Sequence, residues 1–342
     1  MEEYDVIIVG GGPAGLKCAE VLGRSDKSVL LLEKKDRFGD KLCAGGLTKK
    51  DLEVLPLPGE VIEHKISRAA IHSRRQTAET RIQNPFFFTI NRLELGAYQN
   101  SLLKDLKVDV KLNSLVVEVN ENQVVLKDGT RYGYKFLVGA GGYSSMVRRY
   151  LKLPVRKRLI GFQYTIPKSD VESLLEIYLD ARRFSSWYAW IFPHRNSIAV
   201  GFCCDPQKAN YQKMKSRFHD WLKEKNIDPG NAKLESYPIS YDFRGIRFGN
   251  IFLVGEAAGL ASGLTGEGIY QALVSGCEVA RMILDTGYIS EPIKNMLKYN
   301  RILNRLMRLF RFTGPLRNPL FELLLFLMNR KKFREWVNAN FI

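Results

Sequence analysis

Three glycines in a row stand near the start of the chain, in the stretch VGGGPAGLKC at residues 9–18. Glycine weakens both helices and strands, so such a run has to be explained by what it allows. The residues before it, Val6 to Val9, form a continuous β-branched run, which is typical of a strand buried on both faces. Ala14 to Leu22 has apolar side chains at helical spacing, and Val29 to Leu32 predicts a second buried strand. The chain is therefore expected to open with a strand, a tight turn, a helix and a strand.

The glycines follow the spacing Gly10-x-Gly12-x-x-Gly15, and Glu33 ends the second strand. In such a unit the first glycine makes the turn, the second lets the backbone approach a diphosphate, and the third lets the helix pack on the sheet. The helix N-terminus offers free N–H groups to phosphate, and Glu33 would accept hydrogen bonds from an adenosine ribose. The pattern predicts a dinucleotide site. A glycine turn with a purely structural role is the alternative.

A second strand, glycine-rich turn and helix is predicted over residues 249–284, with Glu256 in its turn, and a third over 135–149. In large FAD proteins, a later segment of this kind returns to the first domain and holds the ribityl chain and the flavin. A domain that binds only NAD does not need one. The sequence therefore favours FAD.

Together these three segments resemble the FAD-dependent oxidoreductases of the aromatic hydroxylase type. Three shorter stretches resemble the geranylgeranyl reductase family within that group. GDKLCAGGL at 39–47 is similar to the family's Lys-x-Cys-Gly-Gly-Gly loop, with Ala44 in place of a glycine. YAWIFP at 188–193 matches its Tyr-x-Trp-x-Phe-Pro motif, and LTGEGI at 264–269 also fits.

The chain departs from the hydroxylases at three places. Gly141-Gly142 replaces their Asp-Gly, whose aspartate helps to position NADPH and FAD. Glu256 replaces an aspartate, and Gly259 replaces a histidine. The missing aspartate at Gly141-Gly142 argues against a hydroxylase-type reaction with NADPH, whereas Glu256 keeps a carboxylate.

The resemblance implies an FAD-dependent reductase of C=C bonds in the isoprenoid chains of lipids or prenyl precursors. Hydride would come from reduced FAD, and a proton from Cys43, a tyrosine or water. Only one dinucleotide fingerprint is present, so the flavin would be reduced by transient NAD(P)H or by an external electron carrier such as ferredoxin. The alternatives are a flavin monooxygenase or halogenase, and an FAD-holding protein that binds prenyl lipid without turnover.

The resemblance also implies the site residues. Those expected at the FAD are Gly10, Gly12, Pro13, Ala14, Gly15, Glu33, Lys34, Lys41, Arg92, Gly141, Glu256, Gly266, Gly268 and Ile269. An aromatic wall for the substrate is expected from Tyr188, Trp190, Phe192 and Pro193. The alternatives are a Cys43 that merely fills space and an aromatic strand that is ordinary sheet core. His194 is expected in an exposed loop, and no His or Cys spacing indicates a metal.

These patterns predict an α/β fold with three parts. They are a glycine-rich Rossmann-type FAD-binding domain (1–154, returning at 249–290), an antiparallel-sheet substrate domain (155–248) and a basic, amphipathic helical tail (291–342).

The chain has a net charge of +16, and nine of those charges lie between Lys294 and Glu335. RILNRLMRLFR at 301–311 predicts a helix with arginines on one side and apolar residues on the other, as an anionic membrane surface requires. The alternative is that these helices pack on the catalytic domain and that their arginines are only solvated. The basic residues at 74–75, 81, 148–149 and 156–158 lack the aromatic interleaving of a nucleic-acid groove, and they are expected on the solvated surface. Five scattered cysteines favour a reducing cytosol. The expected protein is cytoplasmic and peripherally membrane-associated, and the sequence does not indicate its oligomeric state.

Overall fold

The computed structural model describes residues 1–206 and 210–330, which fold as two compact units of three stretches each. Unit 1 consists of Met1–Lys41, Arg92–Arg158 and Ile239–Leu303. Unit 2 consists of Leu42–Asn91, Leu159–Pro238 and Asn304–Ile342, of which residues 331–342 lie outside the described part. This division differs from the expected domain limits, because residues 42–91 belong to unit 2. Strand pairing is the reason: β5 (Arg68–His72) pairs in parallel with β13 (Leu174–Tyr178).

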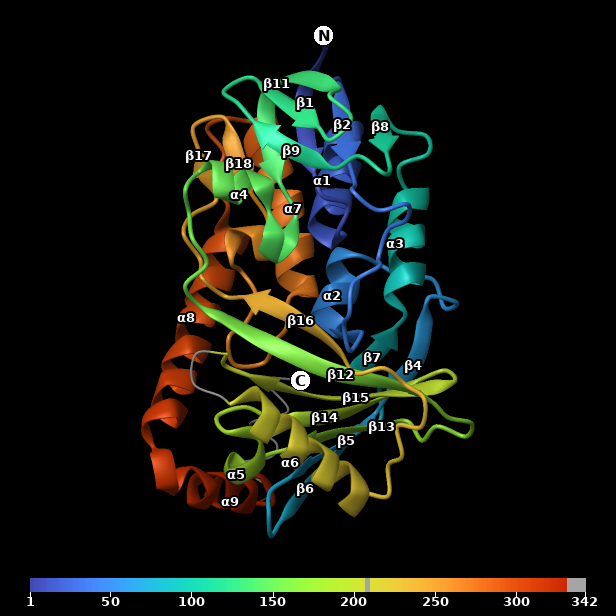
Figure 1. Cartoon of the computed structure of the whole chain (residues 1–342). Coiled ribbons are helices and arrows are strands. Elements are labelled where there is room, and N and C mark those ends of the chain that lie inside the picture. The colour runs from blue at the N-terminus through green and yellow to red at the C-terminus, as the bar shows by residue number, and fades with distance from the viewer. Residues whose placement is uncertain (207–209, 331–342) are drawn as a thin grey trace. The chain divides into compact units, whose positions relative to one another are not determined.

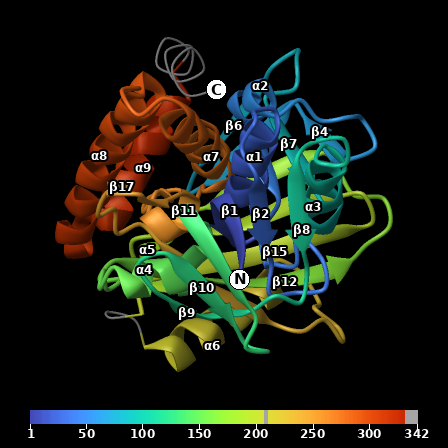
Figure 2. The same ribbon diagram turned by 90° about the horizontal axis from the view of Figure 1, so that it is seen from above.

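The main sheet of unit 1 has the order β17-β18-β11-β1-β2-β8, and β10 and β9 extend from β11 (Figures 1 and 2). Its strands are β1 (Glu2–Val9), β2 (Val29–Leu32), β8 (Val108–Lys111), β9 (Val116–Val119), β10 (Gln123–Leu126), β11 (Arg131–Gly139), β17 (Arg247–Phe248) and β18 (Ile251–Leu253). Strand β1 lies between β2 and β11 and is parallel to both. Its residues Val6, Ile7 and Ile8 are fully buried, as the β-branched run predicted.

The helical elements of unit 1 are α1 (Pro13–Gly23), α3 (Arg92–Ser101), η1 (Gly142–Ser144), α4 (Met146–Tyr150), η2 (Gly255–Ala258) and α7 (Ile269–Leu284). Helices α1 and α7 pack closely at Gly276, where a Cβ atom would lie 2.3 Å from the carbonyl oxygen of Ala14. The strand–turn–helix predicted near the N-terminus and the return segment are therefore neighbours in one unit.

Unit 2 is built on a seven-stranded sheet of order β16-β12-β15-β14-β13-β5-β6 (Figure 1). Besides β5 and β13 its strands are β6 (Thr77–Arg81), β12 (Arg158–Pro167), β14 (Ala189–His194), β15 (Ser197–Cys204) and β16 (Glu235–Ser240). A smaller sheet holds β3 (Gly46–Thr48), β7 (Phe87–Ile90) and β4 (Ile62–Ile66). Helix α6 (Tyr211–Glu224) packs on the large sheet, where Phe218 stacks on Tyr164 at 6.1 Å. The predicted α/β class is confirmed, and the aromatic-rich sheet is antiparallel from β12 through β15 and β14 to β13, where β5 adds a parallel pair.

The remaining helices are α2 (Lys49–Val54), α5 (Ala181–Phe184), α8 (Glu291–Phe312), η3 (Gly314–Leu316) and α9 (Arg317–Met328). Helix α9 is bonded to the β5–β6 hairpin. The Glu322 carboxylate accepts from the hydroxyl of Ser73 at 2.8 Å and from the N–H of Arg75 at 3.2 Å. Leu325 is fully buried in a cluster with Ala78. This part of the expected tail is integral to unit 2.

Helix α8 corrects one expectation. Leu303 and Met307 lie on the apolar side of the helix, which was expected to face the membrane, but both are buried. They continue a buried row with Ile293, Met296 and Asn300. The exposed apolar row is Tyr299, Ile302, Leu306 and Leu309, and the exposed basic row is Lys294, Lys298, Arg301, Arg305 and Arg308. At 100° per residue these three rows follow one another around the helix, so only part of the apolar side is available to a partner. Within the described residues no helix is long and apolar enough to span a bilayer.

Candidate functional site

The glycine turn joins β1 to α1 in a conformation that side chains would obstruct. Gly10 has φ +117°, and a Cβ atom there would lie 2.6 Å from the backbone of Ala140. A Cβ atom on Gly15 would lie 2.0 Å from the carbonyl oxygen of Gly10. The turn therefore closes against the first turn of α1, as the spacing predicted.

The space in front of this turn fits a diphosphate. A Cβ atom on Gly12 would meet nothing within 4 Å. Gly12 caps α1 without a side-chain hydrogen bond, and the first turn carries Pro13 and Ala14 and no acid. Unpartnered N–H groups and a positive helix end favour an anion there. Gly12 is thus the point of closest approach expected for the FAD diphosphate.

Glu33 stands directly after β2 and supports the turn. Its Oε2 accepts from the N–H of Gly11 at 2.7 Å, and its Oε1 accepts from the N–H of Lys35 at 3.0 Å. Lys34 between them is exposed. The carboxylate is therefore fixed beside the glycine turn, and the ribose contact expected of it stays a prediction.

The return segment brings two predicted residues together. The Glu256 carboxylate, in η2, forms an ion pair with Lys41 and accepts from the N–H of Ser240 at 3.0 Å. The Ser240 hydroxyl is buried with no hydrogen-bond partner among the described residues. Gly268 caps α7 without a side-chain hydrogen bond. An uncapped helix end and a buried polar oxygen fit a polar ligand such as the ribityl chain.

The other residues expected at the FAD also lie in unit 1. Arg92 is buried at the start of α3, and Gly141 caps η1. Gly266 has φ +71° in the turn before Ile269, the first residue of α7. Their contacts with FAD stay predictions.

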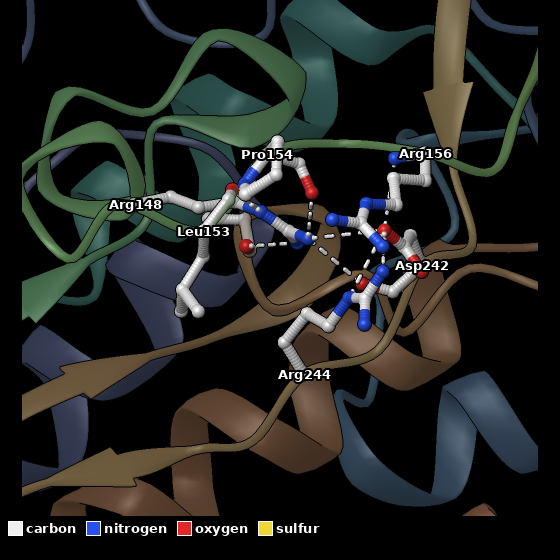
Figure 3. A network of polar contacts seen from close by, with 7 residues as sticks. Arg148, Leu153, Pro154, Arg156, Asp242 and Arg244 are labelled. Atoms are coloured by element: carbon white, nitrogen blue, oxygen red, sulfur yellow. Dashed lines mark hydrogen bonds and ion pairs between the residues drawn. The ribbon is translucent and has the colours of Figure 1, made fainter.

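One of the basic residues expected on the solvated surface, Arg148, is instead buried and joins α4 to this segment (Figure 3). Arg148 is 2% exposed. It donates to the carbonyl oxygens of Leu153, Asp242 and Ala257 at 2.9 Å each. Burial lowers the pKa of its guanidinium, and the Asp242 carboxylate opposes that change. Since Ala257 follows Glu256, Arg148 fixes the backbone that carries the predicted flavin contact.

In unit 2, the loop of residues 42–45, here called the Cys43 loop, meets the aromatic strand β14. Gln163 of β12 donates to the carbonyl oxygen of Cys43 at 3.4 Å. At the end of the loop, a Cβ atom on Gly46 would lie 2.8 Å from the ring of Phe192. Thr89 of β7 donates to the carbonyl oxygen of Pro193 at 2.6 Å. The two stretches that carry the family resemblance are therefore in contact.

The predicted aromatic wall follows β14 only in part. Tyr188 precedes the strand. Its ring centroid nevertheless lies 6.0 Å from that of Trp190, which lies 6.5 Å from that of Phe192. Trp190 is 7% exposed, and its indole N–H has no hydrogen-bond partner among the described residues.

The expectation for His194 was wrong. It ends β14 and is 8% exposed, because both of its ring nitrogens are bonded: Nδ1 to Glu63 and Nε2 to the carbonyl oxygen of Ala44 at 3.1 Å. Its place directly after the aromatic motif was the only signal in the sequence. Gln163 could have been found as the amide side chain within the otherwise apolar and aromatic stretch IGFQY at 160–164. No metal-binding cluster of His, Cys, Asp and Glu occurs in residues 1–206 and 210–330.

Comparison with known proteins agrees with this geometry. The FAD binding domain family model matches residues 3–127. An uncharacterized protein of Methanosarcina barkeri is 30% identical over 306 residues, which are 83% of this chain and 75% of that protein. The chloroplastic geranylgeranyl diphosphate reductase of Nicotiana tabacum is 25% identical over 93% of this chain and 77% of its own length.

Among solved structures, a geranylgeranyl bacteriochlorophyll reductase-like protein from Thermoplasma acidophilum has the same fold, with a TM-score of 0.80 and 21% identity over 97% of this chain and 92% of that one. The matched FAD domain, the glycine turn and the contact of the Cys43 loop with the aromatic strand point the same way. The chain belongs to the geranylgeranyl reductase family, within the FAD-dependent oxidoreductases of the aromatic hydroxylase type.

Proposed function

We propose that this protein reduces isolated C=C bonds in isoprenoid chains of the geranylgeranyl type. One observation carries the proposal: within unit 2, the Cys43 loop is packed against the strand that presents Trp190 and Phe192. A thiol beside an aromatic, largely buried surface suits the apolar chain of a prenyl substrate. The name of the tobacco relative supports the same substrate class.

The roles follow from where the residues lie. Bound in its reduced form, FAD would supply the hydride. The glycine turn and Glu33 hold the dinucleotide, and Lys41 and Glu256 bind its flavin half. Trp190 and Phe192 orient the prenyl chain and exclude water, and Cys43, a tyrosine or water donates the proton. The reductant is transient NAD(P)H or an external electron carrier.

We also propose that α8 rests on an anionic membrane surface, from which a prenyl lipid is drawn. Ile302, Leu306 and Leu309 are 48%, 40% and 58% exposed. The basic row lies beside them on the same helix, so the apolar side chains can enter the acyl boundary while Arg301, Arg305 and their neighbours remain at the headgroups.

The test is chemical. The FAD-loaded protein is reduced with dithionite and incubated anaerobically with geranylgeranyl diphosphate or a geranylgeranyl phospholipid, and the products are analysed by mass spectrometry. We expect the gain of two hydrogen atoms for each bond reduced. Cys43→Ala should keep FAD and slow this gain, whereas Cys277→Ala, a half-buried cysteine in α7, should not. Unchanged lipids in the presence of fully reduced flavin would refute the proposal.

A further inference from the structure

The Cys43 loop is held at three successive carbonyl groups by three different strands. The carbonyl of Cys43 accepts from Gln163 of β12 at 3.4 Å, and that of Ala44 accepts from His194 of β14 at 3.1 Å. The carbonyl of Gly45 accepts from the N–H of Ile90, at the end of β7, at 3.0 Å. Of these three donors, only the His194 side chain is also bonded to a carboxylate, that of Glu63.

His194 is bonded through both ring nitrogens. Its Nδ1 faces the carboxylate of Glu63 on β4, and its Nε2 faces the carbonyl oxygen of Ala44. A carbonyl oxygen can only accept, so Nε2 carries the proton of the bond to the loop. The two side chains are only 10% and 11% exposed, which strengthens this hydrogen bond.

The loop has little freedom beside this pair. Gly45 has φ +69°, and a Cβ atom there would lie 2.3 Å from the carbonyl oxygen of Ile90 and 3.0 Å from Cε1 of His194. The N–H of Gly45 donates to Sγ of Cys43 at 3.4 Å. A shift of the peptide between Ala44 and Gly45 therefore also moves the donor that faces the sulfur.

We propose that His194, held by Glu63, is a positioning residue that fixes the Cys43 loop and the direction of its thiol through the carbonyl of Ala44. The importance of this role for catalysis rests on the proposed function, but the positioning itself does not. His194 touches neither the thiol nor a ligand in this arrangement, so it acts through the loop backbone.

Two amide variants separate the bonds of the ring. In His194→Gln the amide nitrogen takes the place of Nε2 and can still donate to Ala44. In His194→Asn it takes the place of Nδ1 and can donate only to Glu63. Both variants replace the imidazole ring with an uncharged amide, so a comparison between them isolates the hydrogen bond to the loop. His64→Gln is the matched control, because His64 bonds Ser173 on the protein surface.

The measurement is the rate at which iodoacetamide alkylates Cys43 in the FAD-loaded resting protein, followed by peptide mass analysis. We expect His194→Asn to react about tenfold faster than His194→Gln, the scale of one lost hydrogen bond, and the control to match the wild type. Flavin absorbance and urea unfolding verify that each variant is folded. Equal rates in the Asn and Gln variants would overturn the proposal.

Turnover distinguishes this proposal from the proposed function. If both hold, His194→Asn lowers kcat for alkene reduction more than it changes KM, and His194→Gln restores kcat. If no variant or wild-type protein reduces a prenyl chain, but the alkylation rates still differ, the proposed function fails and the positioning role stands.

Discussion

Gly12 is the residue at which cofactor binding and folding can be separated. Its Cβ position is open and its φ of −77° suits any residue, so Gly12→Val should fold. The valine side chain would occupy the space of the FAD diphosphate, and the purified variant should lack flavin absorbance. Gly15→Val is the contrasting variant, because its side chain would collide with the carbonyl of Gly10 and should prevent folding. A Gly12→Val protein that retains FAD would show that the diphosphate lies elsewhere.

Arg148 is expected to be the most sensitive structural position near the flavin segment. Arg148→Met leaves the buried carbonyl oxygens of Asp242 and Ala257 without this donor, while Arg244 keeps its ion pair with the Asp242 carboxylate. Each buried acceptor left without its donor costs about 1–3 kcal/mol. Urea unfolding should show a loss of this size, whereas the neighbouring exposed residue, in Arg149→Met, should change stability by less than about 0.5 kcal/mol. A small loss for both would mean that water replaces the guanidinium.

For single residues, the sequence predicted a role best where only one residue type can satisfy the local geometry. Gly10 and Gly15 are required by close backbone contacts that any side chain would break, so their roles were predictable. His194 was not, because its partners Glu63 and Ala44 are distant in the chain and only the tertiary fold brings them to it. The burial of Arg148 was not predictable for the same reason, because two of its hydrogen bonds reach the carbonyls of Asp242 and Ala257, about a hundred residues away.

Among the elements, strand β1 carries a carboxylate that links three strands of the parallel sheet. Asp5 accepts from the N–H of Ser28 before β2 at 3.0 Å and from Lys135 of β11 at 2.9 Å. The hydrogen bonds from Lys135 and Ser28 lower the pKa of Asp5. Its stabilising contribution is therefore present above the ordinary value of about 4 and is lost as the pH falls through the lower folded value.

Asp5→Asn should accordingly reduce the free energy of unfolding by a constant amount above about pH 5, and the difference from the wild type should shrink in stronger acid. Urea unfolding across this range checks the prediction. Asp26→Asn, at a fully exposed carboxylate, serves as the control. A difference that grows in acid would mean that the sign of the pKa change is reversed.

Helix α8 is the element on which membrane binding depends. Replacing Leu306 and Leu309 by serine should weaken sedimentation with anionic vesicles roughly tenfold, because it removes exposed apolar side chains. Neutralising Arg305 or Arg308 should cost about fivefold each and make the binding less sensitive to salt. Serine at Leu112 and Leu115, which are also exposed, is the matched control. Equal binding of all variants, or equal binding to neutral vesicles, would contradict the proposed surface.

Periodicity located the first elements to within a few residues. The run Val6–Val9 lies in β1, the helical spacing of Ala14–Leu22 lies in α1, and Val29–Leu32 is β2. The amphipathic pattern of α8 could not show which apolar row is buried. Leu303 and Leu306 both belong to the apolar side of the helix, and only the tertiary fold determines that Leu303 is covered and Leu306 is exposed. The assignment of residues 42–91 to unit 2 depends on pairing between strands a hundred residues apart, which local patterns do not encode.

For the whole molecule, the alternation of the two units along the chain predicts coupled unfolding. The chain passes between the units five times. When one unit forms, it brings together the ends of the segments that build the other unit, and this reduces the entropic cost of closing those loops. All tryptophans of the described chain, Trp187, Trp190 and Trp221, lie in unit 2, whereas the FAD site is predicted in unit 1.

FAD at 100 times its Kd should therefore stabilise the state reported by tryptophan fluorescence by up to about 2.7 kcal/mol. Urea titrations of the Trp336→Phe variant, which removes the remaining tryptophan, measure this directly. Gly12→Val, which should not bind FAD, provides the control. If the urea midpoint measured by tryptophan fluorescence does not change with FAD, unit 2 unfolds independently of unit 1.

The bonds between α9 and the β5–β6 hairpin limit how this protein can be engineered. Glu322 and Leu325 supply a carboxylate and a buried apolar side chain to residues some 250 positions earlier. A deletion that removes the C-terminal helices would therefore leave Ser73 and Ala78 exposed, and poor folding could be mistaken for loss of lipid binding. In chimaeras between family members, β5, β6 and α9 should be exchanged together as one module, even though more than two hundred residues of sequence separate them.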